Sequence, residues 1–567
     1  MADLGNQRLP DRKTPMDNYY GNANPDLLAQ VPVTAQAVLE SGVGEGALGA
    51  KYLHINPTAR YYGIETNPMA AETAGRRLTR VWTADCEAFD PEQLPEPPDC
   101  LVYGDVLEHL LDPWALLRRQ AQILLPHGSV SACIPNAAHW SVALEVLRGR
   151  FPYHQDGIFD RTHLRWFNLD GMARLFRAAG LEIVRIVPRV FQPEAAEALV
   201  QRIGGALRDL GIDTGKFLRT AQPLQYVLQA TKQPVPRIFL RFALPAAGAR
   251  GEVAATMRQL RSIPGVQPLP AGSVAQVGNA PTPADTDLLI LPLDGSEEPE
   301  ALARQIARAD KPVVVRIDRP LPAAERYIPL LHAASGIEVA SRDLADWAGR
   351  QNPSTQYFPP AIDRLDPLPE PEPGHPSRVV IGTFGGEAGL GPFAAALDNV
   401  RAMHPEVEFC PVNAADLTLS QHDKQVAARP SDRADLDALE GAEIAVLLAG
   451  SDASIVECER VWLEAARRGA VVLADHTACV GCITDGTTGL LFADADMLAV
   501  QLRRLLRNAE LRTALRLGAR QYLMEQRMLA QQIAARLSWY ASLTEKRGAP
   551  ATSIAAPPSS AKRSVPD

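Results

Sequence analysis

A glycine-rich segment, Gly42-Val43-Gly44-Glu45-Gly46, restricts the fold more than any other feature of the chain. It follows a short apolar segment, residues 37–41, and precedes a segment with helical periodicity. Glycine lets the backbone turn sharply and lets a ligand approach without a Cβ clash. The helix start adds unpaired N–H groups and partial positive charge. The pattern predicts a strand, a ligand-binding loop and a helix, which is the opening unit of an α/β sheet.

The alternation of short apolar runs with helical periods continues along the chain. Buried strands are predicted at residues 37–41, 61–65, 100–103 and 129–134, and a closing strand pair with a helical insertion at 181–190 and 224–231. Such alternation favours a mostly parallel sheet with helices on both faces. With 567 residues, the chain is too long for one core and should form about three to four folding units.

Changes in composition predict the domain boundaries. Two further Rossmann-like lobes follow the first sheet, and the proline-rich segment between them is typical of a stiff hinge beside a cleft. The predicted parts are a disordered N-terminus (1–16), a first α/β domain (17–233), a second (236–364), the hinge (365–377), a third (378–545) and a disordered tail (546–567).

Charge and composition exclude several functional classes. A formal net charge of −9 argues against a nucleic-acid partner. The sequence lacks an apolar run of about 18 residues and a signal peptide, so we expect no membrane span. Seven scattered cysteines suit a reducing, cytoplasmic setting. Cys479 and Cys482 form a CxxC without a second pair, so no metal site is predicted.

Acidic residues follow the strands next to the glycine loop. Glu40 ends the first strand, and Glu65 ends the second at a place where an acid accepts hydrogen bonds from ribose hydroxyls. Asp85 ends a third strand and could accept from an adenine amino group. Residues 44–49 also match the dinucleotide pattern GxGxxG. These residues alone leave open NAD, S-adenosylmethionine, or a turn without a ligand.

Later motifs distinguish these ligands. In order, residues 105–113 (DVLEHLLDP), 124–128 (LLPHG), 134–136 (IPN) and 157–167 (GIFDRTHLRWF) resemble class I S-adenosylmethionine-dependent methyltransferases of the ubiquinone-methyltransferase-like type, over about residues 18–190. Within that type they are similar to a subgroup often attached to glycan-modifying proteins. Residues 41–43 depart conservatively from the family pattern. The resemblance implies a Rossmann-like seven-stranded sheet and S-adenosyl-L-methionine as cofactor. It implies cofactor binding by Glu40, Gly42, Gly44, Gly46, Glu65, Asp85 and Asp105.

Methyl transfer to a hydroxyl group needs oriented reactants and a proton acceptor. The candidates for that acceptor are His163, His109 and Asp160. Arg161 and Arg165 could bind an anionic substrate, or they could pair with nearby aspartates. Four aromatic side chains could line an acceptor site or belong to the core: Trp140, Tyr153, Trp166 and Phe167.

The second half resembles GT-B-type glycosyltransferases over about residues 236–545. The similarity lies in residues 357–363, 462–475 and 483–492, and it implies that Glu464 binds the ribose of a nucleotide-sugar donor. The pattern departs at Val456 and Val461, where the family has an acidic and a basic residue. Residues 385–391 lack the usual basic residue, so a diphosphate would lack a cation there, although glycine-rich backbone could partly substitute.

Taken together, the sequence predicts a cytoplasmic S-adenosylmethionine-dependent methyltransferase that O-methylates a sugar or surface-glycan precursor. Its partners would be a small-molecule or glycan acceptor and, if the second half transfers sugar, a nucleotide-sugar. One alternative is a glycosyltransferase with the methyltransferase-like domain as scaffold. Another is a non-enzymatic glycan-binding factor.

Overall fold

The computed structural model of the chain consists of two compact units, Met1–Leu53 with Pro57–Arg237 and Arg261–Val266, and His54–Asn56 with Ile238–Leu260 and Gln267–Asp567. The structure describes residues 21–244, 252–274, 284–293, 295, 297–368, 378–384, 392–412, 439–449, 455–477 and 481–545. Within these ranges, every helix is too short or too polar to cross a bilayer. The predicted disordered ends lie outside the described residues, as does most of the predicted hinge.

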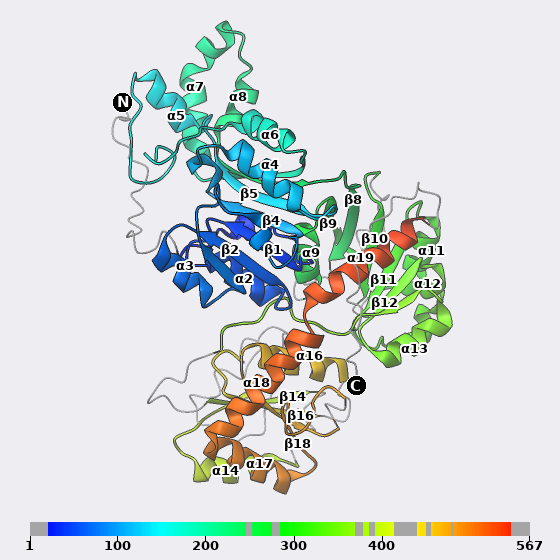
Figure 1. The fold of residues 1–567 in the computed structure, drawn as a ribbon. Helices are drawn as coiled ribbons and strands as arrows, with labels where there is room; N and C mark the ends of the chain where they lie inside the picture. The colour runs from blue at the N-terminus through cyan, green and yellow to red at the C-terminus, as the bar shows by residue number, and fades with distance from the viewer. Residues whose placement is uncertain are drawn as a thin grey trace. The chain divides into compact units, whose positions relative to one another are not determined.

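The first unit contains a seven-stranded sheet in the order β3-β2-β1-β4-β5-β7-β6 (Figure 1). The neighbouring pairs among β1 to β5 are parallel, and β7 is antiparallel to both β5 and β6. The predicted seven-stranded sheet and closing strand pair are therefore confirmed. The strands are β1 (Ala37–Ser41), β2 (Arg60–Glu65), β3 (Arg80–Thr83), β4 (Cys100–Gly104), β5 (Ser129–Pro135), β6 (Glu182–Val190) and β7 (Pro223–Thr231).

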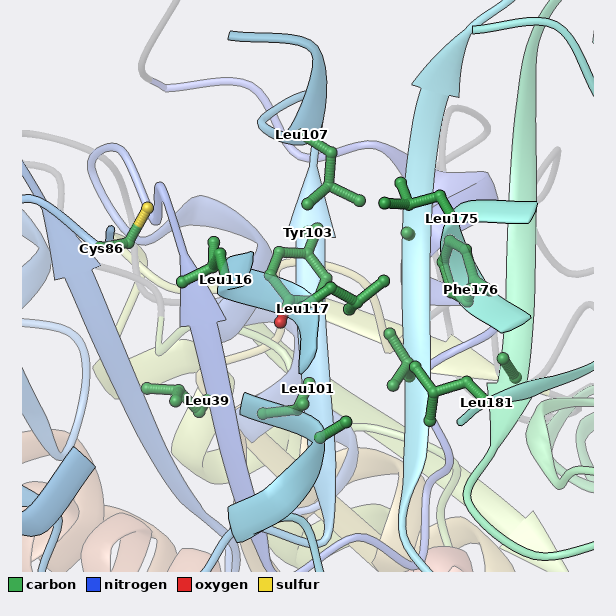
Figure 2. Packing of buried hydrophobic residues seen from close by; sticks show 14 of the residues in the cluster. Leu39, Cys86, Leu101, Tyr103, Leu107, Leu116, Leu117, Leu175, Phe176 and Leu181 are labelled. Atoms are coloured by element: carbon green, nitrogen blue, oxygen red, sulfur yellow. The ribbon is translucent and has the colours of Figure 1, made fainter. Parts of the chain in front are cut away.

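Both faces of this sheet are buried. Leu39 and Leu101 contribute to a core that includes side chains of α4 and α6 (Figure 2), whereas their neighbours Val38 and Val102 contribute to another with α2 and α3. This opposite placement arises because successive side chains along a strand point to opposite faces of the sheet. The helices are α1 (Pro25–Leu28), α2 (Ala47–Ile55), α3 (Pro68–Gly75), α4 (Pro113–Ile123), α5 (Trp140–Leu147), α6 (Leu169–Ala178), α7 (Pro193–Asp209) and α8 (Thr214–Ala221).

The second unit contains two further sheets, of six and five strands. The six-stranded sheet has the order β13-β12-β11-β10-β8-β9, with β8 (Ile238–Leu244), β9 (Val266–Ser273), β10 (Leu288–Leu293), β11 (Val313–Ile317), β12 (Gly336–Val339) and β13 (Thr355–Tyr357). The five-stranded sheet has the order β15-β14-β16-β17-β18, with β14 (Arg378–Phe384), β15 (Glu408–Val412), β16 (Ile444–Ala449), β17 (Val471–Asp475) and β18 (Leu490–Phe492).

Helices accompany both of these sheets. They are α9 (Glu252–Ser262), α11 (Pro299–Arg308), α12 (Ile328–Ala333), α13 (Arg342–Gln351), α14 (Ala394–Met403), α16 (Ile455–Arg467), α17 (Ala495–Arg507), α18 (Ala509–Gln526) and α19 (Leu529–Glu545). The predicted α/β character of this half is confirmed. Its assignment to GT-B lobes stays a prediction, because parallel α/β sheets occur in many unrelated folds.

A network of buried charges stabilises the second unit. The Arg316 guanidinium, only 2% exposed, lies 2.7 Å from Glu252 Oε1, 2.8 Å from Asp318 Oδ1 and 3.3 Å from Glu338 Oε1. Arg536 of α19 contacts Glu252 and Glu338 at 3.3 and 3.2 Å. Tyr540, also on α19, donates to Glu338 Oε2 at 2.7 Å. Each buried carboxylate therefore faces a cation, as burial of charge requires.

Candidate functional site

The candidate site lies at the carboxyl edge of the parallel strands of the first unit. The sheet order changes direction between β1 and β4, and ligands of open α/β sheets bind at such a point. The glycine loop leaves β1 there, and residues 105–109 leave β4. The two segments touch, because a Cβ built on Gly42 would lie 2.4 Å from Val106 Cγ2.

The glycine loop has the conformation that only glycine adopts easily. Gly42, Gly44 and Gly46 have φ angles of 70°, 55° and 78°, in the left-handed region. The N–H groups of Gly42 and Val43 both donate to the carbonyl of Ile64, at 2.8 and 3.1 Å. The loop is therefore fixed against the end of β2, as its sequence predicts.

Two buried glutamates lie beside this loop and differ in their partners. Glu65 accepts hydrogen bonds from the N–H groups of Gly44 and Asn67, both at 2.9 Å. Glu40 accepts from the Tyr61 hydroxyl at 3.0 Å. Burial raises the pKa of Glu40 to about 8, helped by the Glu65 charge and opposed by the Tyr61 hydrogen bond. Glu40 is thus protonated at neutral pH, whereas Glu65 orders the loop.

Two aspartates follow β3 and β4, which lie on opposite sides of β1 in the sheet. Asp85 is exposed and accepts from the N–H of Glu87 at 2.8 Å. Asp105 has a φ of 54°, which is rare for a residue other than glycine and is common at functional sites. Its carboxylate accepts from Gln225 Nε2 at 2.5 Å, and burial raises its pKa to about 6. Gln225 lies on β7, far along the chain, and the sequence offers no signal for it.

The carboxylates at this edge of the sheet suit S-adenosyl-L-methionine. Glu65, Asp85 and Asp105 form no ion pair among the described residues. Their oxygens suit ribose hydroxyls and an adenine amino group, and their negative charge suits a sulfonium cation. Glu65 is the last residue of β2 and accepts from the N–H of Gly44 in the glycine loop, and Asp85 lies just after the end of β3.

The structure brings the two predicted histidines together. The rings of His109 and His163 have centroids 4.8 Å apart. His109 ends the 3₁₀ turn η4 (Leu107–His109), and the N–H groups of Leu164 and Arg165 donate to the carbonyl of Glu108 at 2.9 Å each. These hydrogen bonds hold residues 157–167 against η4. Burial lowers the pKa of His163, and a charge on His109 lowers it further.

Asp160, the third predicted proton acceptor, is engaged with Thr162. It is 6% exposed, and its Oδ1 accepts from the N–H and the hydroxyl of Thr162 at 2.7 and 2.6 Å. The Thr162 hydroxyl in turn lies 3.0 Å from His109 Nδ1. Asp160 therefore fixes the Thr162 side chain that contacts His109, and its role as proton acceptor stays a prediction.

Glu108 is the functional candidate that the sequence did not reveal. It is 1% exposed, and neither carboxylate oxygen has a hydrogen-bond partner in the described structure. Burial raises the pKa of Glu108 well above its usual range, and Asp105 and Asp160 add to this effect. Its place in the DVLEHL motif was visible, but a single glutamate beside apolar residues carries no sign that it will be buried without a partner.

The predicted substrate residues separate into two groups. Arg161 is exposed, and no ion pair joins Arg161 or Arg165 to an aspartate in the described ranges. Tyr153 is 70% exposed, and Trp166 contacts the ring of Phe151 at 5.0 Å. Trp140 is partly buried against the His139 ring. Phe167, by contrast, is 5% exposed and belongs to the main core.

Glu464 in the second unit is already engaged by cations. Its Oε1 lies 2.6 Å from both Arg467 Nη2 and Arg468 Nη1, and Arg467 also contacts Asp366 at 2.6 Å. The predicted contact with a donor ribose would have to compete with these ion pairs. Residues 385–391 and Cys479 lie outside the described residues, so the predictions made there have no structural counterpart.

Comparison with known proteins finds a family match at the N-terminal part of the chain. Residues 3–186 match the model of a family described as a methyltransferase domain. The chain is 36% identical over 114 residues to a trans-aconitate 2-methyltransferase of Methylobacterium nodulans, and 33% identical over 115 residues to that of Methylobacterium radiotolerans. Each match covers 20% of this chain and 43% of the relative, so the chain spans less than half the length of these curated relatives.

Solved methyltransferase structures are also similar, at low identity. The O-methyltransferase from a trans-AT PKS multienzyme of Brevibacillus brevis is 18% identical, covers 37% of this chain and 70% of its own, and has a TM-score of 0.26. The plantazolicin methyltransferase BpumL, solved with a substrate analogue and SAH, is 16% identical, covers 40% and 88%, and has a TM-score of 0.27. The family match spans the glycine loop and the histidine pair.

Proposed function

Since residues 3–186 match a methyltransferase domain, with S-adenosyl-L-methionine as cofactor, we propose that the chain O-methylates a small molecule bound beside His109 and His163. One observation carries the proposal. Gly42 of the loop packs on Val106, and the N–H of His109 donates to the carbonyl of Val106 at 2.9 Å. The loop and the histidine pair therefore flank the same short segment.

Each part of this edge has a task. When bound, S-adenosyl-L-methionine supplies an electrophilic sulfonium methyl group. Glu65 and Asp85 accept hydrogen bonds from its ribose and adenine, and the glycine loop lets the backbone approach. His109 and His163 lie beside the acceptor hydroxyl, and orientation of the two reactants supplies much of the rate enhancement. The lowered pKa of His163 keeps its imidazole neutral at physiological pH.

For the acceptor, we propose a sugar or surface-glycan precursor. Phe151 and Tyr153 are 45% and 70% exposed, and the Phe151 ring contacts those of Tyr153 and Trp166. Flat aromatic faces suit the apolar faces of sugar rings. A second candidate is a carboxylic acid. The exposed guanidinium of Arg161 and the names of the two curated relatives favour it.

For the second unit, we propose that it binds the same glycan. The ion pairs that engage Glu464 favour binding over sugar transfer. Glycosyl transfer, with a nucleotide-sugar as donor, is the alternative. Melting of the full chain with UDP-, GDP- and dTDP-sugars separates the two, since a raised melting temperature with one of them would favour the transferase.

Calorimetry with S-adenosyl-L-methionine tests the first part of the proposal. The full chain should bind it, and Gly44→Asp should abolish binding because a side chain at Gly44 would obstruct the close approach of the ligand to the loop backbone. Lys51→Gln, on the exposed side of α2, is the matched control. Mass spectrometry should then detect one added methyl group on a neutral sugar, a uronic acid or trans-aconitate. Failure of the wild-type chain to bind the cofactor would refute the proposed function.

A further inference from the structure

We propose that Glu108, His109 and His163 bind one divalent transition-metal ion, such as Zn²⁺, which holds the acceptor oxygen. One ligand atom from each side chain can be chosen so that the three atoms lie within 4.8 Å of one another. The sequence alone predicts no metal site, because its one candidate is the Cys479 and Cys482 pair. The role given to the ion depends on the proposed function, but binding of the ion does not.

The carboxylate of Glu108 is the first observation. Both oxygens are buried, and neither has a hydrogen-bond partner in the described part of the chain. An unpaired buried carboxylate costs several kcal/mol if it is ionised, unless a cation or donors compensate it. The only basic groups that the cluster brings to it are the two imidazoles. A bound cation would compensate both oxygens at once.

The orientation of the two imidazoles is the second observation. His109 Nδ1 lies 3.2 Å from the Thr162 carbonyl oxygen, and His163 Nδ1 lies 3.1 Å from the Ile158 carbonyl oxygen. A carbonyl only accepts, so both Nδ1 atoms carry the proton and both Nε2 atoms present a lone pair. Imidazoles that bind metals are held in this way, with the second nitrogen donating to a carbonyl or carboxylate.

The backbone fixes the three ligands relative to one another. Glu108 and His109 are adjacent in η4, and the Glu108 carbonyl accepts from the residues immediately after His163. Asp160 accepts from the Thr162 hydroxyl, which also contacts His109. Thr162 is therefore a positioning residue. These hydrogen bonds fix the arrangement of the ligands, so little further ordering is needed on binding.

The donor set indicates the kind of ion. Two imidazoles and one carboxylate suit Zn²⁺ and related transition metals better than Mg²⁺ or Ca²⁺, which prefer oxygen. Three protein ligands leave a coordination position for the substrate, as in catalytic zinc sites. There the ion would lower the pKa of the acceptor hydroxyl, whose proton passes to water. The oxygen then forms the C–O bond to the methyl group, and the C–S electron pair stays on sulfur.

Metal titration of the full chain tests the site without an activity assay. Protein freed of metal with a chelator should bind one Zn²⁺ by calorimetry, and Co²⁺ should give visible absorption bands of a site with N and O ligands. Glu108→Gln and His163→Gln should weaken binding more than the ~10–100-fold expected for loss of an outer partner, and Thr162→Val should fall within that range. His127→Gln, at an exposed histidine outside the cluster, should bind like wild type.

Three outcomes would overturn the site. The first is that neither Zn²⁺ nor Co²⁺ binds. The second is that Zn²⁺ binds Glu108→Gln and His163→Gln with wild-type affinity. The third is that binding is lost in Cys482→Ser and kept in Glu108→Gln, which would assign the ion to the cysteines. Calorimetry with S-adenosyl-L-methionine on the same variants checks their folding. It also separates the two proposals. If the ion binds and S-adenosyl-L-methionine does not, only the proposed function is refuted.

Discussion

Two buried glutamates, one in each unit, are alike in burial and opposite in surroundings. Glu108 in the first unit and Glu338 in the second are each 1% exposed. Glu338 lies within ion-pair distance of Arg316 and Arg536 and accepts from Tyr540. Glu108 has no hydrogen-bond partner within the described residues. A buried carboxylate with cations around it belongs to the scaffold, whereas one left without compensation indicates a place where something else binds.

The difference also concerns where the partners come from. The cations around Glu338 come from β11 and α19, so the charge network joins distant parts of the second unit. Around Glu108 the neighbours are other acids and two histidines; burial raises the pKa of Glu108 and lowers that of His163. Perturbed titration behaviour is typical of functional sites, where stability is given up for binding or catalysis.

The largest expected effect is a loss of stability when the buried ion pairs around Arg316 are broken. Arg316→Met removes one cation from three acidic side chains and leaves buried charge uncompensated. The free energy of unfolding of the second unit should fall by about 3–5 kcal/mol, measured by urea denaturation. Arg326→Met breaks the exposed pair with Glu298 and should cost no more than about 1 kcal/mol. Equal costs for both variants would contradict the distinction drawn between the two glutamates.

The next largest effect is the pH dependence of stability that buried Glu40 gives to the first unit. The pKa of Glu40 rises from 4.5 to about 8 on folding, so the native state holds a proton that the unfolded chain loses. Wild-type stability should therefore fall as pH rises from about 4.5 to 8, by at most roughly 1.4 kcal/mol per pH unit. Glu40→Gln should remove this fall, seen as a flatter melting temperature against pH. A parallel pH profile in the variant would show that Glu40 is ionised.

Gly42→Ala should weaken cofactor binding, because the new side chain strains the glycine loop. The new Cβ would lie 2.4 Å from Val106 at a φ of 70°, which should cost about 1–3 kcal/mol and weaken S-adenosyl-L-methionine binding. Gly75→Ala in α3, where a Cβ meets nothing within 4 Å, should be neutral or stabilising. Calorimetry and melting of both variants measure the contrast, and unchanged binding in Gly42→Ala would count against the loop as the cofactor site.

The smallest effect tests the charge of the acceptor. Arg161→Ala should raise KM for a uronate or trans-aconitate by up to about tenfold, since an exposed charge contributes little. A neutral sugar should be unaffected. Arg174→Ala on α6, whose guanidinium pairs with Asp170, is the control. Equal KM values for both kinds of acceptor in the variant and wild type would remove Arg161 from the acceptor site.

Local patterns predicted much of the first unit. The strand expected at residues 37–41 is β1, and those expected at 61–65, 100–103 and 129–134 differ from the observed strands by one residue at an end. In the second unit β9, β13 and β18 were not predicted. Strands β13 and β18 have three residues and carry too little periodicity, and β9 contains prolines and a glycine, which are depleted in strands. The glycine loop and the acids at strand ends were predicted because each directly follows a strand that the local pattern reveals. Parallel strands place their carboxyl ends at one edge of the sheet, so these residues gather there.

The sequence by itself determined the α/β sheet, the conformation of the glycine loop and the edge at which a ligand binds, because these depend on neighbours a few residues apart. Only the tertiary structure decided that His163 lies beside His109, since hydrogen bonds from residues 164 and 165 to Glu108 bring the two segments together. It also decided that Glu108 is unpaired while Glu338 is paired. Whether a buried charge finds a partner depends on residues from distant segments, and that information is absent from any local pattern.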